Sequence, residues 1–370
     1  MSDTGGGHRA SAEAIQAALE RESNDEIRVK IIDVFQEYAP YPLSRLPDWY
    51  PVIVSRGSEF WRRGFHMSDG LLRAKALNHL AWPYVRGAIR KLIRENPADV
   101  IICVPPLFVG PVLQGLGKPR PPFITVVTDL ISSHSWWFDK RTDLTLVPTE
   151  DARRRALTCG LDPGLVKVVG LPISKRFYGP QENRVTLRKA LGWQPDVDTV
   201  LLLGGADGIG PLRDITHALA QSSLPIQLAI VCGRNRPLRA YLSSQAWPLD
   251  THVYGFVRNM QTMMLSADLV VTKAGPSSVI ETLTCGRPLV LCSAVPGQEE
   301  GTVRYIVENG AGLWAPTPEK VVKAVKELVS TSTHKMAVMA TNAKRLTQHP
   351  DAAHTIAQEI CCMLPRLSIA

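Results

Sequence analysis

Short runs of apolar, mostly β-branched residues recur along this chain and alternate with segments of helical periodicity. Such runs are typical of strands that are buried on both faces of a parallel sheet. The alternation predicts an α/β protein with two doubly wound units, each a parallel sheet with helices on both faces. The expected strands lie at residues 27–34, 100–104, 123–128, 144–147 and 166–169 in the first unit, and at 199–203, 227–232, 251–254, 269–272, 289–291 and 312–314 in the second.

A polar, broken segment separates the two series of strands. The chain has 370 residues, which is long for one ordinary core and favours two domains. We expect the linker near residues 172–180, with one domain over 1–173 and the other over 174–349. The last helix, within residues 350–370, is expected to pack back on the first domain.

Composition narrows the class of partner. A formal net charge of +8 suits a phosphate-bearing partner such as a nucleotide, a nucleic acid or an anionic membrane, although a solvated surface with surplus arginine gives the same balance. No nucleic-acid-binding module is recognisable. The 7 cysteines form no Cys-x-x-Cys pair, which favours a reducing compartment. Neither a signal peptide nor an apolar run long enough to span a membrane is present.

Three glycines ending at Gly7 run directly into His8 and a helix expected over residues 11–21. The glycines allow positive φ and a close approach of ligand, and the start of a helix favours anionic oxygen. The loop matches neither a P-loop nor a dinucleotide fingerprint. His8 titrates near neutral pH and is therefore a candidate general base. A strand normally precedes such a loop, so we expect that strand to lie upstream of Met1.

The ligands of doubly wound sheets bind beyond the carboxyl ends of the strands. Gly204 and Gly205 follow one strand and can offer backbone N–H groups to a diphosphate; the alternative is a tight turn built for close packing. Arg234 follows the next strand and suits a phosphate or a nucleobase edge; its alternative is a surface arginine.

A further strand end leads through Lys273 into a helix whose start can face a phosphate. Glu281 lies one turn into this helix and could accept hydrogen bonds from two ribose hydroxyls, but Ser278 and Glu281 also fit a capping box. The polar loop at residues 296–301 suits a polyhydroxyl ligand such as a hexose, or is simply solvated.

Two acidic features have more than one interpretation. Asp129 ends a strand of the first domain, where it could orient a histidine, line an acceptor pocket or cap a turn. Asp196 and Asp198 form an Asp-x-Asp pair of the kind that binds metal in some glycosyltransferases, but the pair precedes a strand, which favours a turn. We predict no metal site.

Taken together, these motifs resemble glycosyltransferase family 28, a family of the GT-B fold, and within it the monogalactosyldiacylglycerol synthases of the chloroplast type. The resemblance rests on the segments MSDTGGGHRASAEA at residues 1–14, ITVVTDL at 124–130, GLP at 170–172, LGGADGIGP at 203–211, CGRN at 232–235, TKAGP at 272–276 and PGQEEG at 296–301.

The resemblance implies two Rossmann-like domains that face each other across a cleft. It further implies inverting, metal-independent transfer of galactose from UDP-galactose to the free hydroxyl of 1,2-diacylglycerol, with no cofactor. The first domain would bind the acceptor and the membrane, and the second the UDP-sugar. His8 would be the base, Phe256 would lie beside the uracil, and Gln298 and Glu299 would contact the sugar hydroxyls. The expected donor-binding residues are Gly7, Gly204, Gly205, Arg234, Phe256, Lys273, Ala274, Gly275, Pro276, Glu281, Gln298 and Glu299.

The stretch from residue 40 to 82 shows no clean period and interleaves aromatic residues with arginine. That mixture suits an interface with anionic lipid, although such aromatics can equally be core. The expected contacts are Trp61, Arg62, Arg63 and Phe65, with Trp136 and Trp137 as a second group. We therefore expect a peripheral, monotopic enzyme at the cytoplasmic face of a membrane.

Other functions remain open at this point. Galactose and glucose differ in the orientation of one hydroxyl, so a UDP-glucose-dependent diacylglycerol glucosyltransferase is one alternative. A soluble UDP-sugar epimerase shares the fold but needs no hydrophobic acceptor surface. A nucleotide-sugar-binding protein that has lost catalysis is the third alternative, and the presence of His8 speaks against it.

Overall fold

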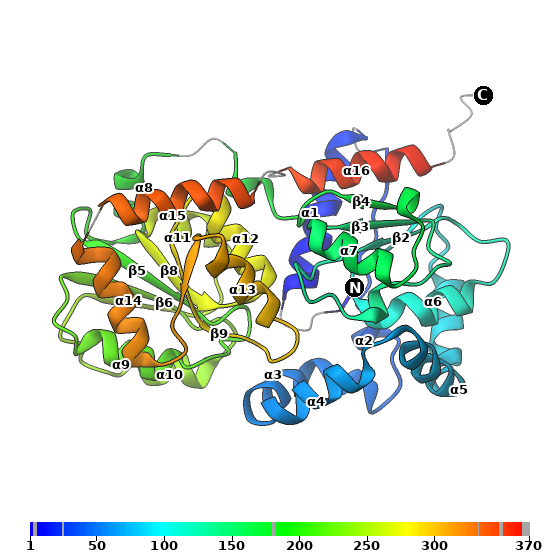
Figure 1. Ribbon diagram of the computed structural model, residues 1–370, viewed down its shortest axis with the longest axis horizontal. Coiled ribbons are helices and arrows are strands. Elements are labelled where there is room, and N and C mark those ends of the chain that lie inside the picture. The colour runs from blue at the N-terminus through cyan, green and yellow to red at the C-terminus, as the bar shows by residue number, and fades with distance from the viewer. Residues whose placement is uncertain (3–5, 24–25, 180–181, 332, 348–350, 365–370) are drawn as a thin grey trace. The chain divides into compact units, whose positions relative to one another are not determined.

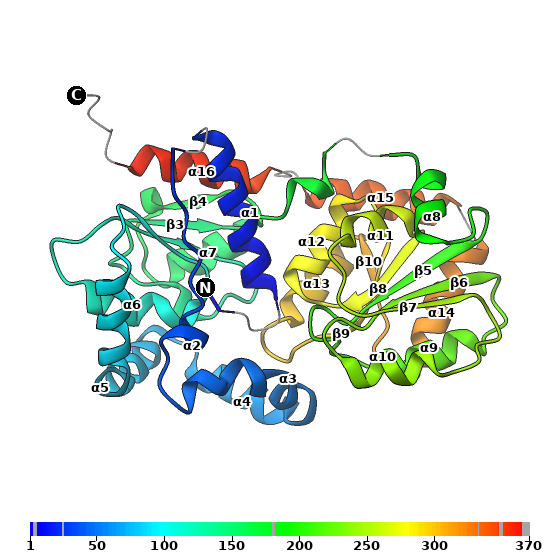
Figure 2. The same ribbon diagram turned by 180° about the vertical axis from the view of Figure 1, so that it is seen from behind.

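The computed structural model describes residues 1–2, 6–23, 26–179, 182–331, 333–347 and 351–364 (Figures 1 and 2). The chain divides into two compact units. Unit 1 comprises residues 1–174, 296–298 and 351–370, and unit 2 comprises residues 175–295 and 299–350. The division after Ser174 falls inside the segment where we expected the linker.

Unit 2 contains a six-stranded parallel sheet in the order β10-β9-β8-β5-β6-β7. Its central strands are buried along most of their length, which is why their sequences are continuous apolar runs rather than alternating ones. The chain runs outward in opposite directions from β5 and β8, so the switch point of the sheet lies between these two strands. The strands are β5 (Asp198–Leu203), β6 (Ile226–Val231), β7 (Thr251–Tyr254), β8 (Leu269–Lys273), β9 (Leu289–Ser293) and β10 (Gly312–Trp314).

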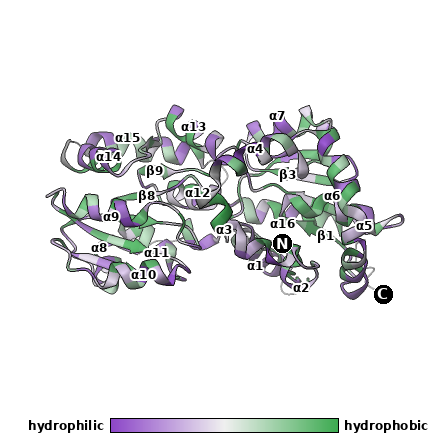
Figure 3. Cartoon of the chain, turned by 90° about the horizontal axis from the view of Figure 1, so that it is seen from below, coloured by the Kyte–Doolittle hydropathy of each residue, from purple (hydrophilic) through white to green (hydrophobic). Residues whose placement is uncertain are grey.

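Helices cover both faces of this sheet. Figure 1 shows α9, α10 and α14 along one face and α8, α11, α12 and α15 along the other. Figure 3 shows hydrophilic and hydrophobic stretches on the helices, as expected when one side of each helix is buried. The helices are α8 (Arg184–Leu191), α9 (Leu212–Ala220), α10 (Arg236–Ser243), α11 (Met260–Ser266), α12 (Pro276–Thr284), α13 (Glu300–Glu308), α14 (Pro318–Thr331) and α15 (Thr333–Leu346).

Unit 1 contains a four-stranded parallel sheet in the order β1-β2-β3-β4. Alternate residues of β2 face opposite sides: Ile124 packs under α1 and α16, whereas Phe123 packs with α5 and α6. The elements are β1 (Ile101–Cys103), β2 (Phe123–Val126), β3 (Leu144–Val147), β4 (Val166–Val168), α1 (Gly7–Glu22), α5 (Leu71–Glu95), α6 (Val109–Leu116), α7 (Glu150–Thr158) and α16 (Ala352–Met363). Short 3-10 turns are η2 (Pro106–Phe108), η3 (Ser135–Trp137), η4 (Pro163–Leu165) and η5 (Lys175–Phe177).

The strand expected at residues 27–34 is not formed, and this prediction was wrong. Residues 27–33 form no regular secondary structure and lie outside the sheet, and α2 (Val34–Glu37) follows them. A strand exists only where a neighbour pairs its backbone. Here the Met1 ammonium donates to the Ile32 carbonyl at 2.6 Å, and the Val34 N–H donates to the Met1 carbonyl at 3.1 Å. The β-branched side chains are nevertheless used, because Ile27 and Val29 pack against the core.

The prediction that residues 40–82 are irregular was also wrong. This stretch forms η1 (Leu43–Arg45), α3 (Leu46–Arg56), α4 (Ser58–Ser68) and the first half of α5. Pro51 lies inside α3, where a proline is not expected, and it obscured the helical pattern; Pro83, just beyond the stretch, lies inside α5. The helical period was also obscured because many large apolar side chains on these helices point to solvent instead of toward a core. In the part of the chain that the structure describes, no helix is both long and apolar enough to cross a bilayer.

Candidate active site

His8 is the second residue of α1, directly after Gly7. Gly6 precedes the helix with φ 76°, a left-handed conformation that glycine adopts without strain. The Nδ1 atom of His8 lies 3.0 Å from the Thr128 hydroxyl oxygen, at the carboxyl end of β2. Burial, with a smaller effect of the charged chain terminus, lowers the pKa of His8 to about 4. His8 is therefore neutral at pH 7, and a Thr128 oxygen that accepts the Nδ1 proton leaves the Nε2 lone pair free to act as a base.

Asp129 directly follows Thr128 in the chain, and one of its partners is an indole. Its Oδ2 atom accepts a hydrogen bond from Trp137 Nε1 at 2.7 Å, and both side chains are buried. The Trp137 ring meets the His8 ring edge-on, with the ring centres 6.0 Å apart. Asp129 thus holds the wall against which the imidazole packs. Thr128, which contacts the imidazole directly, was missed by the sequence analysis although it ends the same strand.

The loop that carries Trp137 is anchored to the corner between α4 and α5. The Asp69 Oδ1 atom accepts the backbone N–H of Ser135 at 2.9 Å, and both Asp69 oxygens lie 2.7 Å from Nη2 of Arg155. Hydrogen bonds from Ser135 and the charge of Arg155 outweigh burial and lower the pKa of Asp69. The carboxylate is therefore ionised and fixes the backbone of the loop next to His8. This link had no recognisable signal in the sequence.

In unit 2, the turn after β5 packs closely on the loop after β6. A Cβ at Gly204 would lie 2.6 Å from the Gly208 Cα within the turn, and a Cβ at Gly208 would lie 2.2 Å from the Cys232 carbonyl oxygen after β6. Gly205 has φ 67°, so close packing and backbone conformation both contribute to the choice of glycine in this turn. The guanidinium of Arg234 contacts Asp207 at 3.0 Å and lies 5.9 Å from the centre of the exposed Phe256 ring. A flat ring beside a fixed guanidinium is a surface on which a nucleobase can stack.

Helix α12 begins at the switch point of the unit 2 sheet, and the N–H groups of its first turn point away from the helix. Gly275 is the N-cap and has no side-chain cap, and Pro276 is the first helical residue. The capping-box interpretation of Ser278 and Glu281 was therefore wrong, and the helix start remains open to an anion. Before it, the Ala274 N–H donates to the Ser293 carbonyl at 2.7 Å, which fixes the turn.

Two acidic residues of the donor-binding prediction have distinct environments in unit 2. Burial raises the pKa of Glu281 to about 8, so its carboxyl group is largely protonated at pH 7 and can donate as well as accept a hydrogen bond. The Glu299 Oε1 atom lies 2.5 Å from Lys273 Nζ in an ion pair. Gln298, the other expected sugar ligand, belongs to unit 1.

The residues expected at the membrane are only partly at the surface. Trp137 is fully buried and belongs to the core, so its placement at the membrane was wrong; Phe65 packs edge-on against His134 at 4.9 Å between ring centres. Arg62 and Arg63 are exposed and pair with Glu59 on α4. Trp61 and Trp136 are partly buried. The exposed large hydrophobic side chains of this region are others: Tyr41, Trp49, Val52, Phe60, Met67, Leu72, Leu77, Leu80 and Tyr84.

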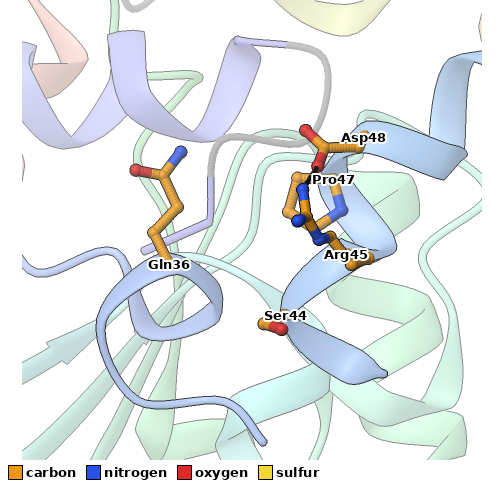
Figure 4. A pocket seen from close by; sticks show the side chains of 5 residues that line it. All are labelled: Gln36, Ser44, Arg45, Pro47 and Asp48. Carbon is orange, nitrogen blue, oxygen red and sulfur yellow. Dashed lines mark hydrogen bonds and ion pairs between the residues drawn. The ribbon is translucent and has the colours of Figure 1, made fainter. Parts of the chain in front are cut away.

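A polar pocket of about 420 Å³ opens beside these helices in unit 1. Figure 4 shows Gln36 of α2 on one side and the ion-paired Arg45 and Asp48 on the other. Ser44 and Pro47 complete the lining, and the sequence analysis singled out none of these residues. Among the described residues, no group of three or more His, Cys, Asp or Glu side chains is arranged to hold a metal ion.

Comparison with known proteins gives matches to two protein families. Residues 8–173 match the family "Monogalactosyldiacylglycerol (MGDG) synthase", and residues 199–356 match the "Glycosyltransferase family 28 C-terminal domain". Chloroplastic monogalactosyldiacylglycerol synthase 3 of Arabidopsis thaliana is 38% identical over 97% of this chain and 79% of its own length. The chloroplastic synthase of Spinacia oleracea is 34% identical over 97% of this chain and 71% of its own.

Solved structures agree on the fold. MurG of Acinetobacter baumannii superposes with a TM-score of 0.60 over 98% of this chain and 97% of its own, at 15% identity. S. aureus MnaA, solved with UDP, superposes with a TM-score of 0.60 over 94% of this chain and 93% of its own, at 13% identity. The fold is GT-B, and with the matched domains it defines a glycosyltransferase. Within that class, the chain belongs to the monogalactosyldiacylglycerol synthase family.

Proposed function

We propose that this chain transfers galactose from UDP-galactose to the free hydroxyl of 1,2-diacylglycerol, with inversion at the anomeric carbon and without a metal ion. The observation that carries the proposal is His8, a neutral imidazole at a helix start whose Nδ1 atom is held by Thr128. Family membership supplies the substrate class, since the relatives are named for the product monogalactosyldiacylglycerol.

In the proposed reaction, Nε2 of His8 removes the proton of the acceptor hydroxyl while its oxygen attacks the anomeric carbon. The bond to the UDP oxygen breaks on the opposite face of the sugar, which inverts the configuration. A base that is neutral across physiological pH is always in the form that can accept this proton. The wall formed by Trp137 and Asp129 keeps the imidazole in one orientation.

Negative charge develops on the diphosphate as it leaves, and unit 2 gathers positive groups at the switch point of its sheet. Support comes from the ammonium of Lys273, the last residue of β8, and from the uncapped start of α12, which follows that strand. Arg234 and Phe256 offer a stacking surface for the uracil, and Glu281 can exchange hydrogen bonds with the ribose hydroxyls. These donor contacts are proposals from the geometry of unit 2.

We further propose peripheral attachment to a membrane through α3, α4 and α5. Leu72 is 84% exposed and Phe60 is 78% exposed. Transfer of each side chain from water into an apolar phase is favourable by about 2 kcal/mol. The second half of α5 carries the exposed cations Arg86, Arg90, Lys91 and Arg94, which suit an anionic lipid surface. Both features lie within unit 1, the unit that holds His8.

The test is an assay with liposomes that contain diacylglycerol and phosphatidylglycerol, offered UDP-galactose and UDP-glucose separately in the presence of EDTA. We expect β-linked galactolipid, identified by the anomeric proton coupling. Glucolipid alone would favour the glucosyltransferase alternative. Interconversion of a UDP-sugar without lipid would favour an epimerase, and UDP binding without any turnover would favour a binding protein.

A further inference from the structure

The side chain of Lys273 runs between the two glycine turns at the switch point of the unit 2 sheet. A Cβ at Gly205 would lie 3.5 Å from Lys273 Cε, and a Cβ at Gly275 would lie 2.8 Å from its Nζ. Gly205 belongs to the turn after β5, and Gly275 is the N-cap at the start of α12. The Lys273 side chain therefore lies between the turn after β5 and the start of α12, and a larger side chain at position 275 would collide with its ammonium.

Glu299 holds this ammonium with a carboxylate whose two oxygens are both engaged. Oε1 lies 2.5 Å from Lys273 Nζ, and Oε2 accepts the backbone N–H of Val295 at 2.8 Å. The Glu299 side chain is only 3% exposed. A ligand of sugar hydroxyls needs an accessible oxygen, and this carboxylate faces into unit 2 instead.

We infer that Glu299 is a positioning residue that holds the Lys273 ammonium at the two glycine turns, where Lys273 binds the donor diphosphate, and that Glu299 does not contact the sugar. The inference rests on the proposed function, because it takes the donor to be a nucleoside diphosphate sugar. It changes the role that family resemblance implies for Glu299.

Physical chemistry supports this arrangement. A lysine side chain loses much rotamer freedom when it is fixed, and a buried carboxylate that fixes it in advance removes that cost from ligand binding. The ammonium has three N–H donors, of which Glu299 occupies one, so two remain for phosphate oxygens. The bond to the Val295 N–H also ties Glu299 to the loop that follows β9, while Lys273 itself ends β8.

The discriminating experiment compares the affinities of UDP and UDP-galactose without acceptor, measured by titration calorimetry. Glu299→Gln is expected to weaken both ligands by the same factor, about tenfold, because it removes a charged hydrogen bond that acts on the diphosphate contact alone. Lys273→Met is expected to weaken both at least as much. The double variant should be no weaker than Lys273→Met, since Glu299 acts through Lys273.

A matched control is Glu308→Gln, which removes an exposed carboxylate at the far end of α13 and should leave both affinities unchanged. Uridine binding, which involves no phosphate, should be the same in all variants and reports that unit 2 is folded. If Glu299→Gln loses uridine binding, Glu299→Asp, which keeps the charge but is shorter, is measured by the same criteria.

Loss of UDP-galactose affinity with unchanged UDP affinity would assign Glu299 to the sugar and overturn the inference. A double variant that is weaker than Lys273→Met by the full Glu299 factor would overturn it as well. Failure of the wild-type protein to bind UDP is a different result, because it contradicts the proposed function and not the role of Glu299 within it.

Discussion

The pair formed by Arg188 and Asp268 offers a stringent test of the physical account of unit 2. The side chains are 1% and 4% exposed, and they form a buried ion pair between Nη2 and Oδ2. Arg188 also donates to the carbonyls of Ser266 at 2.9 Å and Pro195 at 2.7 Å, and Asp268 accepts the Thr199 N–H at 2.7 Å. The pair thus fixes the start of β5, whose other end carries the Gly204 turn.

Replacing Asp268 by alanine leaves the Arg188 charge buried, and its Nη2 atom loses the carboxylate that it contacts. The Thr199 N–H also loses its hydrogen-bond acceptor. Breaking a buried pair in this way costs about 3 to 5 kcal/mol. The matched control is Arg184→Ala, because Arg184 contacts the same carboxylate but is 40% exposed and can turn into solvent. That change should cost about 1 kcal/mol or less.

Hydrogen exchange of native protein, followed by mass spectrometry, resolves the two units. Peptides that cover β5 and β8 should lose protection in Asp268→Ala by the stated amount, whereas peptides of β2 and β3 in unit 1 should change little. The double variant Arg188→Met with Asp268→Leu should be more stable than Asp268→Ala alone, since it removes both charges. Equal effects of Asp268→Ala and Arg184→Ala would refute this reasoning.

Three further predictions concern activity and membrane binding. Because burial lowers the pKa of His8 to about 4, His8 becomes protonated only as the pH falls through that value, so the acid limb of kcat/KM should lie near pH 4 and not near 6.5. His8→Ala should lower kcat by about 10² to 10⁴ while UDP affinity is retained. Leu72→Lys with Leu80→Lys should reduce flotation with liposomes, whereas Val307→Lys, an exposed site in unit 2, should not; equal flotation of all three proteins would contradict the membrane surface. Asp69→Ala frees the Ser135 N–H and should lower kcat while flotation persists, and an unchanged kcat would show that this corner does not support His8.

Much of the fold followed from local pattern. The ten strands of the two sheets lie within two residues of the expected runs, because a strand buried on both faces must be apolar throughout and is easily recognised. The prediction for residues 27–33 was wrong because their composition is that of a strand, whereas a strand forms only if a neighbouring strand pairs with it. The helices within residues 40–82 were not predicted because they expose apolar side chains, whereas the search for a helical period assumes that such side chains are buried.

The sequence by itself determined the parallel α/β architecture, the position of His8 at a helix start and the groups at the strand ends of unit 2. Only the tertiary structure decided which of these groups touch. It put Thr128 against the imidazole, and it turned Glu299 toward Lys273. The reason is that a motif records the order of residues, whereas hydrogen bonds and ion pairs depend on side-chain directions that packing of distant strands sets.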